Sequence, residues 1–200
     1  MSNRSRHTYL RALVAFAAVA LGLPGAASAQ TPSTGGSVYV PPPPPAERAK
    51  IVNGIAVPPI AAPARVRRAI DAANLIVRKP YIYGGGHKPY PGRKQAMITA
   101  NLDDGYDCSG TISFALYGGR FLNSPLASSS FMGWGLEGKG RWITVYTNPG
   151  HAYVVIGGLR LDTSGGDRLA PEERRSGKGP RWRKYNRSPI GYTARHPKNY

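Results

Sequence analysis

The sequence predicts one α+β domain in which N-terminal helices pack on a small antiparallel sheet. Helical periodicity comes first along the chain, and three short strand-like runs follow beyond residue 140. Helices and strands that occupy separate parts of a chain are typical of an antiparallel sheet covered by helices, not of alternating parallel units. The chain of 200 residues also leaves room for N-terminal segments outside one domain of ordinary size.

Residues 1–29 have the pattern of a secretory signal peptide. Three arginines precede an apolar run from Leu13 to Leu23, and small residues at 27–29 complete the pattern of a cleavage site. We therefore expect a secreted protein of the periplasm or the extracellular cell envelope. No other long apolar segment follows, so we expect no membrane span after processing.

Three further segments follow the signal. Residues 30–62 are predicted to be a Pro-rich linker, because the five prolines from Pro41 to Pro45 favour extended polyproline II. Residues 63–165 are predicted to form the folded domain. Residues 166–200 are predicted to be a basic C-terminal extension with a local charge of +7, and its Trp182, Tyr185 and Tyr192 indicate some docking on the domain.

Within the domain, a first helix is expected from about Ala64 to Val77, with Pro63 in its first turn. Its apolar residues recur at helical spacing and predict a buried stripe. A second helix is expected to start at Cys108. The strand-like runs are Trp142 to Tyr146, His151 to Ile156, and Leu159 to Thr163.

Cys108 is the only cysteine of the chain. Exported proteins usually pair their cysteines, so a lone one is idle, intermolecular or chemical, and we favour the chemical role. At a helix start the unpaired N–H groups and the helix dipole favour the thiolate. His151 is the candidate base. These two residues predict a thiol hydrolase.

An orienting partner for His151 follows from the expected hairpin. If Gly157-Gly158 forms a two-residue turn, Asp162 lies on the same sheet face as His151, on the diagonal. A carboxylate there would fix the imidazole tautomer and stabilise the imidazolium. Asp162 is therefore predicted as the third catalytic residue. Ser164, directly across from His151, is the rival, and a solvated turn aspartate is the alternative without function.

Three motifs together resemble the NlpC/P60 cysteine peptidases of bacterial cell walls: residues 81–85 (YIYGG), residues 107–110 (DCSG) and residues 150–153 (GHAY) before a strand. The resemblance covers about residues 65–165. It implies a papain-like core and cleavage of peptide bonds in peptidoglycan stem peptides, often between D-glutamate and a diamino acid. It further implies Cys108 as nucleophile, His151 as base and Tyr81 lining the site.

Two features depart from the family pattern. The family more often has histidine or a neutral polar residue where this chain has Asp162, and the connection between Gly86 and Cys108 is longer than usual. Near the nucleophile, Asp107 is expected to cap the helix, and Ser109 is expected to shape the substrate-binding site without reacting. His87 is expected to be an exposed loop residue outside the catalytic set.

Charge and composition limit the partners. Residues 1–29 contain three arginines and no acid, so the chain beyond them keeps +14 of the formal +17. Such a chain seeks polyanions, which for an exported protein are anionic wall polymers, and we expect the basic tail to bind them. Nucleic acid is not expected as a partner, and no cofactor is expected. The histidine and cysteine spacing predicts no metal site.

Three functions stay open at this point. The first is a secreted cell-wall hydrolase of the thiol type. The second is a papain-like thiol amidase or acyltransferase that keeps Cys108 and His151. The third is a non-catalytic, cationic wall-binding protein.

Overall fold

The computed structural model describes residues 47–91, 99, 102–164 and 179–200. These residues all belong to one compact unit, Tyr39–Tyr200. The predicted signal peptide, most of the predicted linker, residues 92–98 and 100–101 of the long connection, and residues 165–178 lie outside the described part. No helix within the described part is long and apolar enough to cross a membrane.

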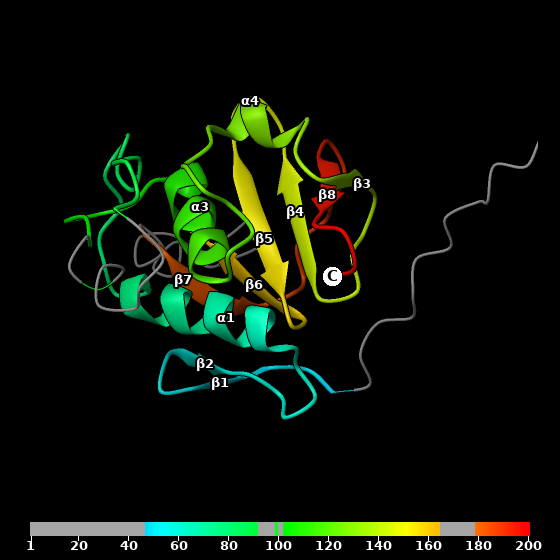
Figure 1. The fold of residues 1–200 in the computed structure, drawn as a ribbon. Helices are drawn as coiled ribbons and strands as arrows, with labels where there is room; N and C mark the ends of the chain where they lie inside the picture. Colours follow the sequence, from blue (N-terminus) through cyan, green and yellow to red (C-terminus); the bar gives the residue numbers. More distant parts are fainter. Residues whose placement is uncertain (1–46, 92–98, 100–101, 165–178) are drawn as a thin grey trace, which may run out of the picture. The chain divides into compact units, whose positions relative to one another are not determined.

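The main sheet has six strands in the order β3-β8-β4-β5-β6-β7, and every neighbouring pair is antiparallel. The predicted class of helices with an antiparallel sheet is thus confirmed (Figure 1). The strands are β3 (Leu136–Glu137), β4 (Ile143–Thr147), β5 (Ala152–Ile156), β6 (Leu159–Asp162), β7 (Arg181–Lys184) and β8 (Thr193–His196).

Three described helices accompany the sheet: α1 (Ala64–Ile76), α3 (Cys108–Gly118) and the short α4 (Ser128–Phe131). The predicted apolar stripe of α1 is buried, because every fourth or third residue faces its neighbour α3. Helix α3 is buried from Ser109 to Gly118, since α1 packs on one side of it and strands β5 and β6 on another. Its uninterrupted apolar stretch is explained by this central position.

Side chains alternate between the two faces of the sheet. Ile143, Val145, Val154 and Leu161 join α1 and α3 in the hydrophobic core. Tyr146, Tyr153, Arg160 and Asp162 have the opposite parity and lie on the face away from these helices. The sheet therefore has an apolar helix-covered face and a second face that carries tyrosines and charged groups.

The domain begins earlier than the expected start at Pro63. Strands β1 (Lys50–Val52) and β2 (Ile55–Val57) form a hairpin within the segment predicted to be linker. Ala56 is buried, and its backbone N–H and C=O pair with the side-chain amide of Asn74 on α1. The hairpin covers α1, as Figure 1 shows, and proline content alone did not reveal it.

The described part of the C-terminal segment, residues 179–200, is likewise part of the fold. Strand β7 pairs with β6, and β8 lies between β3 and β4. Trp182 is buried in the core, and its indole N–H donates to Asn74. Basic residues obscured these strands in the sequence, because β7 reads Arg-Trp-Arg-Lys and offers no apolar run.

Candidate active site

Cys108 is the first residue of α3, so its thiol lies at the positive end of a helix. Asp107 caps this helix as predicted: its carboxylate accepts the Gly110 N–H at 2.7 Å and the Gly84 N–H at 3.1 Å. Burial raises the pKa of Asp107, but the hydrogen bonds from His87 and from these N–H groups outweigh it and hold the pKa below its ordinary value. The cap holds the nucleophile at a fixed place on the domain.

Glycines allow the loop at 84–86 to approach the helix start. Gly85 accepts the Asp107 N–H at 3.1 Å. A Cβ on Gly110 would collide with the Gly85 carbonyl, and a Cβ on Gly85 would collide with the Gly105 carbonyl. The glycines of both motifs therefore serve close backbone packing behind Cys108.

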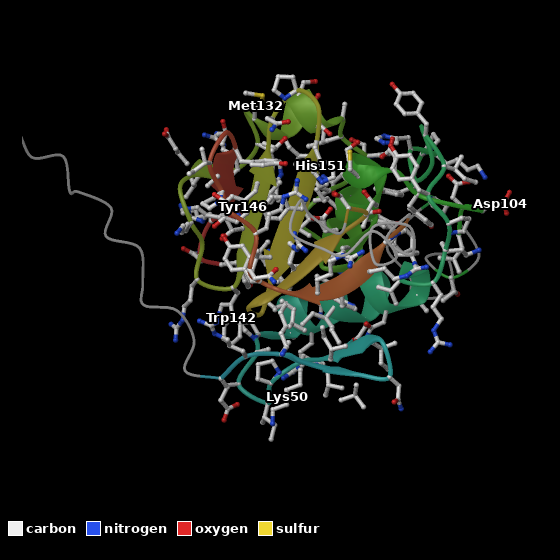
Figure 2. The ribbon with its side chains drawn as sticks, turned by 180° about the vertical axis from the view of Figure 1, so that it is seen from behind. Lys50, Asp104, Met132, Trp142, Tyr146 and His151 are labelled. Atoms are coloured by element: carbon white, nitrogen blue, oxygen red, sulfur yellow. The ribbon has the colours of Figure 1, made fainter. Side chains whose placement is uncertain are left out.

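His151 is positioned by the turn that joins β4 to β5. The Asn148 side chain accepts the backbone N–H of Gly150 at 3.0 Å and of His151 at 2.8 Å, and the Asn148 N–H donates to the His151 carbonyl at 2.9 Å. This side-chain-stabilised turn fixes the backbone of His151. The imidazole, one-fifth exposed, lies on the sheet face away from α1 (Figure 2).

The predicted hairpin register is present. Ile156 pairs with Leu159, and Gly157 and Gly158 have positive φ angles of 58° and 83°, as a two-residue turn of this kind requires. The imidazole Nε2 of His151 lies 3.0 Å from Oδ1 of Asp162. The side chain beside the imidazole is thus that of Asp162 and not that of the rival Ser164. The Ser164 backbone N–H donates to the same Oδ1 at 2.8 Å.

The imidazole connects the carboxylate to the thiol. Interaction with Cys108 is among the causes that shift the pKa of His151, and because Nε2 faces Asp162, the nitrogen available to the thiol is Nδ1. Burial lowers the pKa of His151, but the hydrogen bonds to Asp162 and Cys108 outweigh it and raise the pKa to about 9. An imidazole with this pKa is protonated at neutral pH.

The thiol is shifted in the complementary direction. Burial raises the pKa of Cys108, whereas hydrogen bonds from His151, from Ser128 and from the Ala152 N–H lower it, and the net pKa is below its ordinary value. The Ser128 hydroxyl lies 3.5 Å from the sulfur. Thiolate and imidazolium therefore stabilise each other.

Two arginines hold Asp162 from the other side. Nη1 of Arg187 lies 3.0 Å from its Oδ2, and Nη1 of Arg160 lies 3.3 Å from the same oxygen. Arg187 also donates to the Tyr192 hydroxyl at 2.9 Å, and the Tyr192 ring meets the His151 ring edge to face at 6.4 Å. Arg187 and Tyr192 were not predicted as site residues, because they belong to the segment expected to be a basic extension. Arg160 was detectable, because it shares a sheet face with Asp162.

Tyr81 and Ser109 differ in their placement. Tyr81 is 41% exposed; partial burial and the charges of Cys108 and Asp107 raise its pKa, so the hydroxyl keeps its proton. Ser109 is only 5% exposed, and its hydroxyl donates to Asp107 at 3.2 Å. Ser109 thus supports the helix cap, and little of it is open to a substrate.

His87 corrects the expectation of an exposed loop histidine. Its side chain is 28% exposed, and Nε2 lies 3.1 Å from Asp107 and 3.2 Å from the Ser109 hydroxyl. The hydrogen bond to Asp107 raises the pKa of His87 against the effect of burial. A second imidazole therefore stands behind the nucleophile. Within the described residues no three His, Cys, Asp or Glu side chains gather as metal ligands would.

Comparisons with known proteins add solved structures only. No family model and no curated protein matches the chain. The peptidoglycan hydrolase RipB from Mycobacterium tuberculosis is 21% identical, with a TM-score of 0.46 over 70% of this chain and 68% of that one.

Two variants of the resuscitation promoting factor interacting protein RipA are 17% and 18% identical, with TM-scores of 0.45 and 0.42. The matches cover 78% and 75% of this chain, and 71% and 69% of the RipA chains. At these identities and TM-scores the likeness assigns neither an activity nor a residue role to this chain.

Proposed function

We propose that the protein is a secreted thiol hydrolase that cleaves peptide bonds in peptidoglycan stem peptides through an acyl-enzyme intermediate. The observation that carries the proposal is that Nε2 of His151 lies 3.0 Å from the buried Asp162 carboxylate, while interaction between the imidazole and the Cys108 thiol raises the pKa of His151 and lowers that of Cys108. A hydrogen-bonded nucleophile, base and orienting group is the arrangement that nucleophilic catalysis requires.

In the proposed reaction the Cys108 thiolate attacks the carbonyl carbon of the scissile amide. The charge that develops on the carbonyl oxygen is met by the backbone N–H of Cys108 at the start of α3. Tyr81 is the second donor in this proposal because the motif at residues 81–85 resembles that of the NlpC/P60 family, in which this tyrosine lines the site. Donors fixed in advance stabilise this charge without reorganisation during the reaction.

His151 then transfers its Nδ1 proton to the leaving amine, and the C–N bond breaks to leave a thioester on Cys108. The neutral imidazole takes a proton from water, whose oxygen attacks the thioester; the C–S bond breaks and releases the carboxylic acid, and the Cys108 thiolate and the imidazolium are restored. Asp162 holds the Nε2–H throughout, so that Nδ1 stays directed at the sulfur.

The stem-peptide substrate is supported by the three motifs that resemble the NlpC/P60 peptidases, by the predicted signal and by the positive charge of the chain beyond residue 29. The mature chain and its Cys108→Ala variant should be incubated with muropeptides and the products identified by mass spectrometry. The proposal is supported if new free amine and carboxyl ends are found in muropeptides incubated with the mature chain and not in those incubated with Cys108→Ala.

Two outcomes of that experiment would contradict it. Transfer of the acyl group to an added amine, without hydrolysis, would assign the acyltransferase chemistry instead. Identical digests from the mature chain and Cys108→Ala would remove the thiol from the reaction.

A further inference from the structure

A second site lies on the sheet face that carries His151. A pocket of about 250 Å³ opens there, and none of Cys108, His151 and Asp162 lines it. Besides Thr144, Val155 and three glycines, its lining includes three cationic and three aromatic side chains: Arg48, Lys139, Arg141, Trp142, Tyr146 and Tyr185. Four separate parts of the chain thus meet in one pocket.

Strand register places this pocket relative to the thiol. Val155 lines the pocket and follows His151 by four residues on the same sheet face, which corresponds to about 13 Å along a strand. Tyr146 also lines it and pairs with Tyr153, which lies between His151 and Val155. Figure 2 shows His151, Tyr146 and Trp142 following one another along this face. The pocket is therefore near the candidate active site but separate from it.

The pocket is positively charged and uncompensated. Arg48, Lys139 and Arg141 are exposed, and no aspartate or glutamate lines the pocket. None of the three cations makes an ion pair with another described residue, whereas the acids around the thiol are paired with Lys88, His87 and the arginines at Asp162. Cations gathered on one concave surface favour an anionic ligand.

The aromatic walls restrict which anion fits. The ring centroids of Tyr146 and Tyr185 are 5.8 Å apart, and burial, followed by the influence of Tyr185, raises the pKa of Tyr146. Aromatic rings present a flat apolar surface beside polar edges, which matches the C–H face and the hydroxyl rim of a sugar ring. The volume is below the 300–1,000 Å³ or so of drug-sized sites, so a single ring fits it better than an extended chain.

We propose that this pocket binds an acidic saccharide unit, that is, a sugar ring carrying a carboxylate or a phosphate. The site would hold the chain on an anionic glycan while the thiol, one strand length away, remains free for its own substrate. This goes beyond the proposed hydrolysis, because binding here needs neither Cys108 nor His151. It also replaces the basic tail as the expected anchor, since β7 and β8 belong to the sheet.

Calorimetric titration of the full mature chain carrying Cys108→Ser tests the site without turnover. One arm uses an oligogalacturonate as the carboxylated sugar, and another uses a glucose phosphate polymer. A neutral oligogalactose and an acyclic polyglutamate of matched charge are the comparison ligands. We expect at least one acidic saccharide to bind at least tenfold more tightly than both comparison ligands, and the tighter arm identifies the anionic group.

Matched variants locate the binding. Arg48→Ser, Lys139→Ser and Arg141→Ser together should weaken binding by at least about a hundredfold, since each charge-assisted contact contributes roughly tenfold. The control triple variant, Arg67→Ser, Arg78→Ser and Arg120→Ser, removes the same charge from exposed positions outside the pocket and should change affinity less than about threefold, as expected for screened long-range charge.

Equal losses in the two triple variants would overturn the pocket, and equally tight binding of polyglutamate would overturn the saccharide assignment. No binding in either acidic arm would overturn the site altogether. Because the titration uses an inactive thiol variant, its result is independent of whether muropeptides are cleaved.

Discussion

Asp162→Asn separates the structural role of the carboxylate from its role beside His151. The side chain of Asp162 is fully buried and binds His151 at 3.0 Å, Arg187 at 3.0 Å and Arg160 at 3.3 Å. Asparagine keeps the shape and one acceptor oxygen but removes the negative charge. Arg160 and Arg187 then both lose this anionic partner.

The cost in stability follows from the burial of these groups. Removing one partner of a buried ion pair costs about 3–5 kcal/mol. Arg160 is 3% exposed, whereas Arg187 is 15% exposed and can turn partly to water. We therefore expect Asp162→Asn to lower the free energy of unfolding by about 3 kcal/mol, which leaves a folded domain if the total lies within the usual range of about 5–15 kcal/mol. Urea denaturation followed by tryptophan fluorescence measures this change.

Asp162→Asn should also change the chemistry of His151 and Cys108. Unlike the loss of stability, this change should not be reversed by removing Arg187. The hydrogen bond to Asp162 is among the causes that raise the pKa of His151 to about 9, so Asp162→Asn should lower that pKa. The imidazolium then loses its proton at lower pH, and the alkaline limb of kcat/KM should move down from about pH 9. The rate of Cys108 alkylation by iodoacetamide at neutral pH should fall at least about tenfold, because less thiolate is paired with imidazolium.

A second substitution tests this separation. Asp162→Asn combined with Arg187→Gln should recover part of the lost stability, because it removes one unpaired guanidinium, but it should not restore alkylation. If Asp162→Asn matches the parent in both stability and thiol reactivity, Asp162 neither balances the arginines nor orients His151. Recovery of full reactivity in the double variant would equally contradict an orienting role for Asp162.

His151→Ala should raise the pKa of Cys108 and shift its alkylation profile towards that of a free thiol, as followed with iodoacetamide over pH; an unchanged profile would contradict the pair. Gly110→Ala should destabilise the domain by about 2 kcal/mol or more in urea, because its Cβ meets the Gly85 carbonyl, whereas Gly133→Ala, which meets nothing within 4 Å, should not. Truncation after Ser164 should abolish the cooperative thermal transition, since β7 and β8 are lost.

Local chemistry made some features accessible from sequence. The cap at Asp107 and the turn at Gly157-Gly158 depend on neighbours within a few residues, and both are present. The two-residue turn at Gly157-Gly158 also fixes the strand register, and this register places Asp162 on the same sheet face as His151. Strand alternation would also have placed Arg160 there, two residues before Asp162.

Features that depend on distant contacts were not accessible in this way. The hairpin at 50–57 is short, and its burial comes from α1 rather than from its own periodicity. His87 reads as a loop residue, yet the cap of a helix twenty residues later supplies its partner. Sequence spacing gives no sign of such a pair, because the connection between them can close in many ways.

The C-terminal segment shows why fold and site cannot be assigned to separate parts of this chain. Strand β7 completes one edge of the sheet, and three residues beyond it Arg187 returns to Asp162. Its guanidinium lies 5.3 Å from the Tyr153 ring and 5.5 Å from the Tyr192 ring. These contacts hold a cation beside the buried carboxylate, 3.0 Å from its Oδ2. The basic composition of this segment indicates a solvated tail. Its Arg187 nevertheless supplies the counter-charge to Asp162, on which the orientation of the imidazole depends.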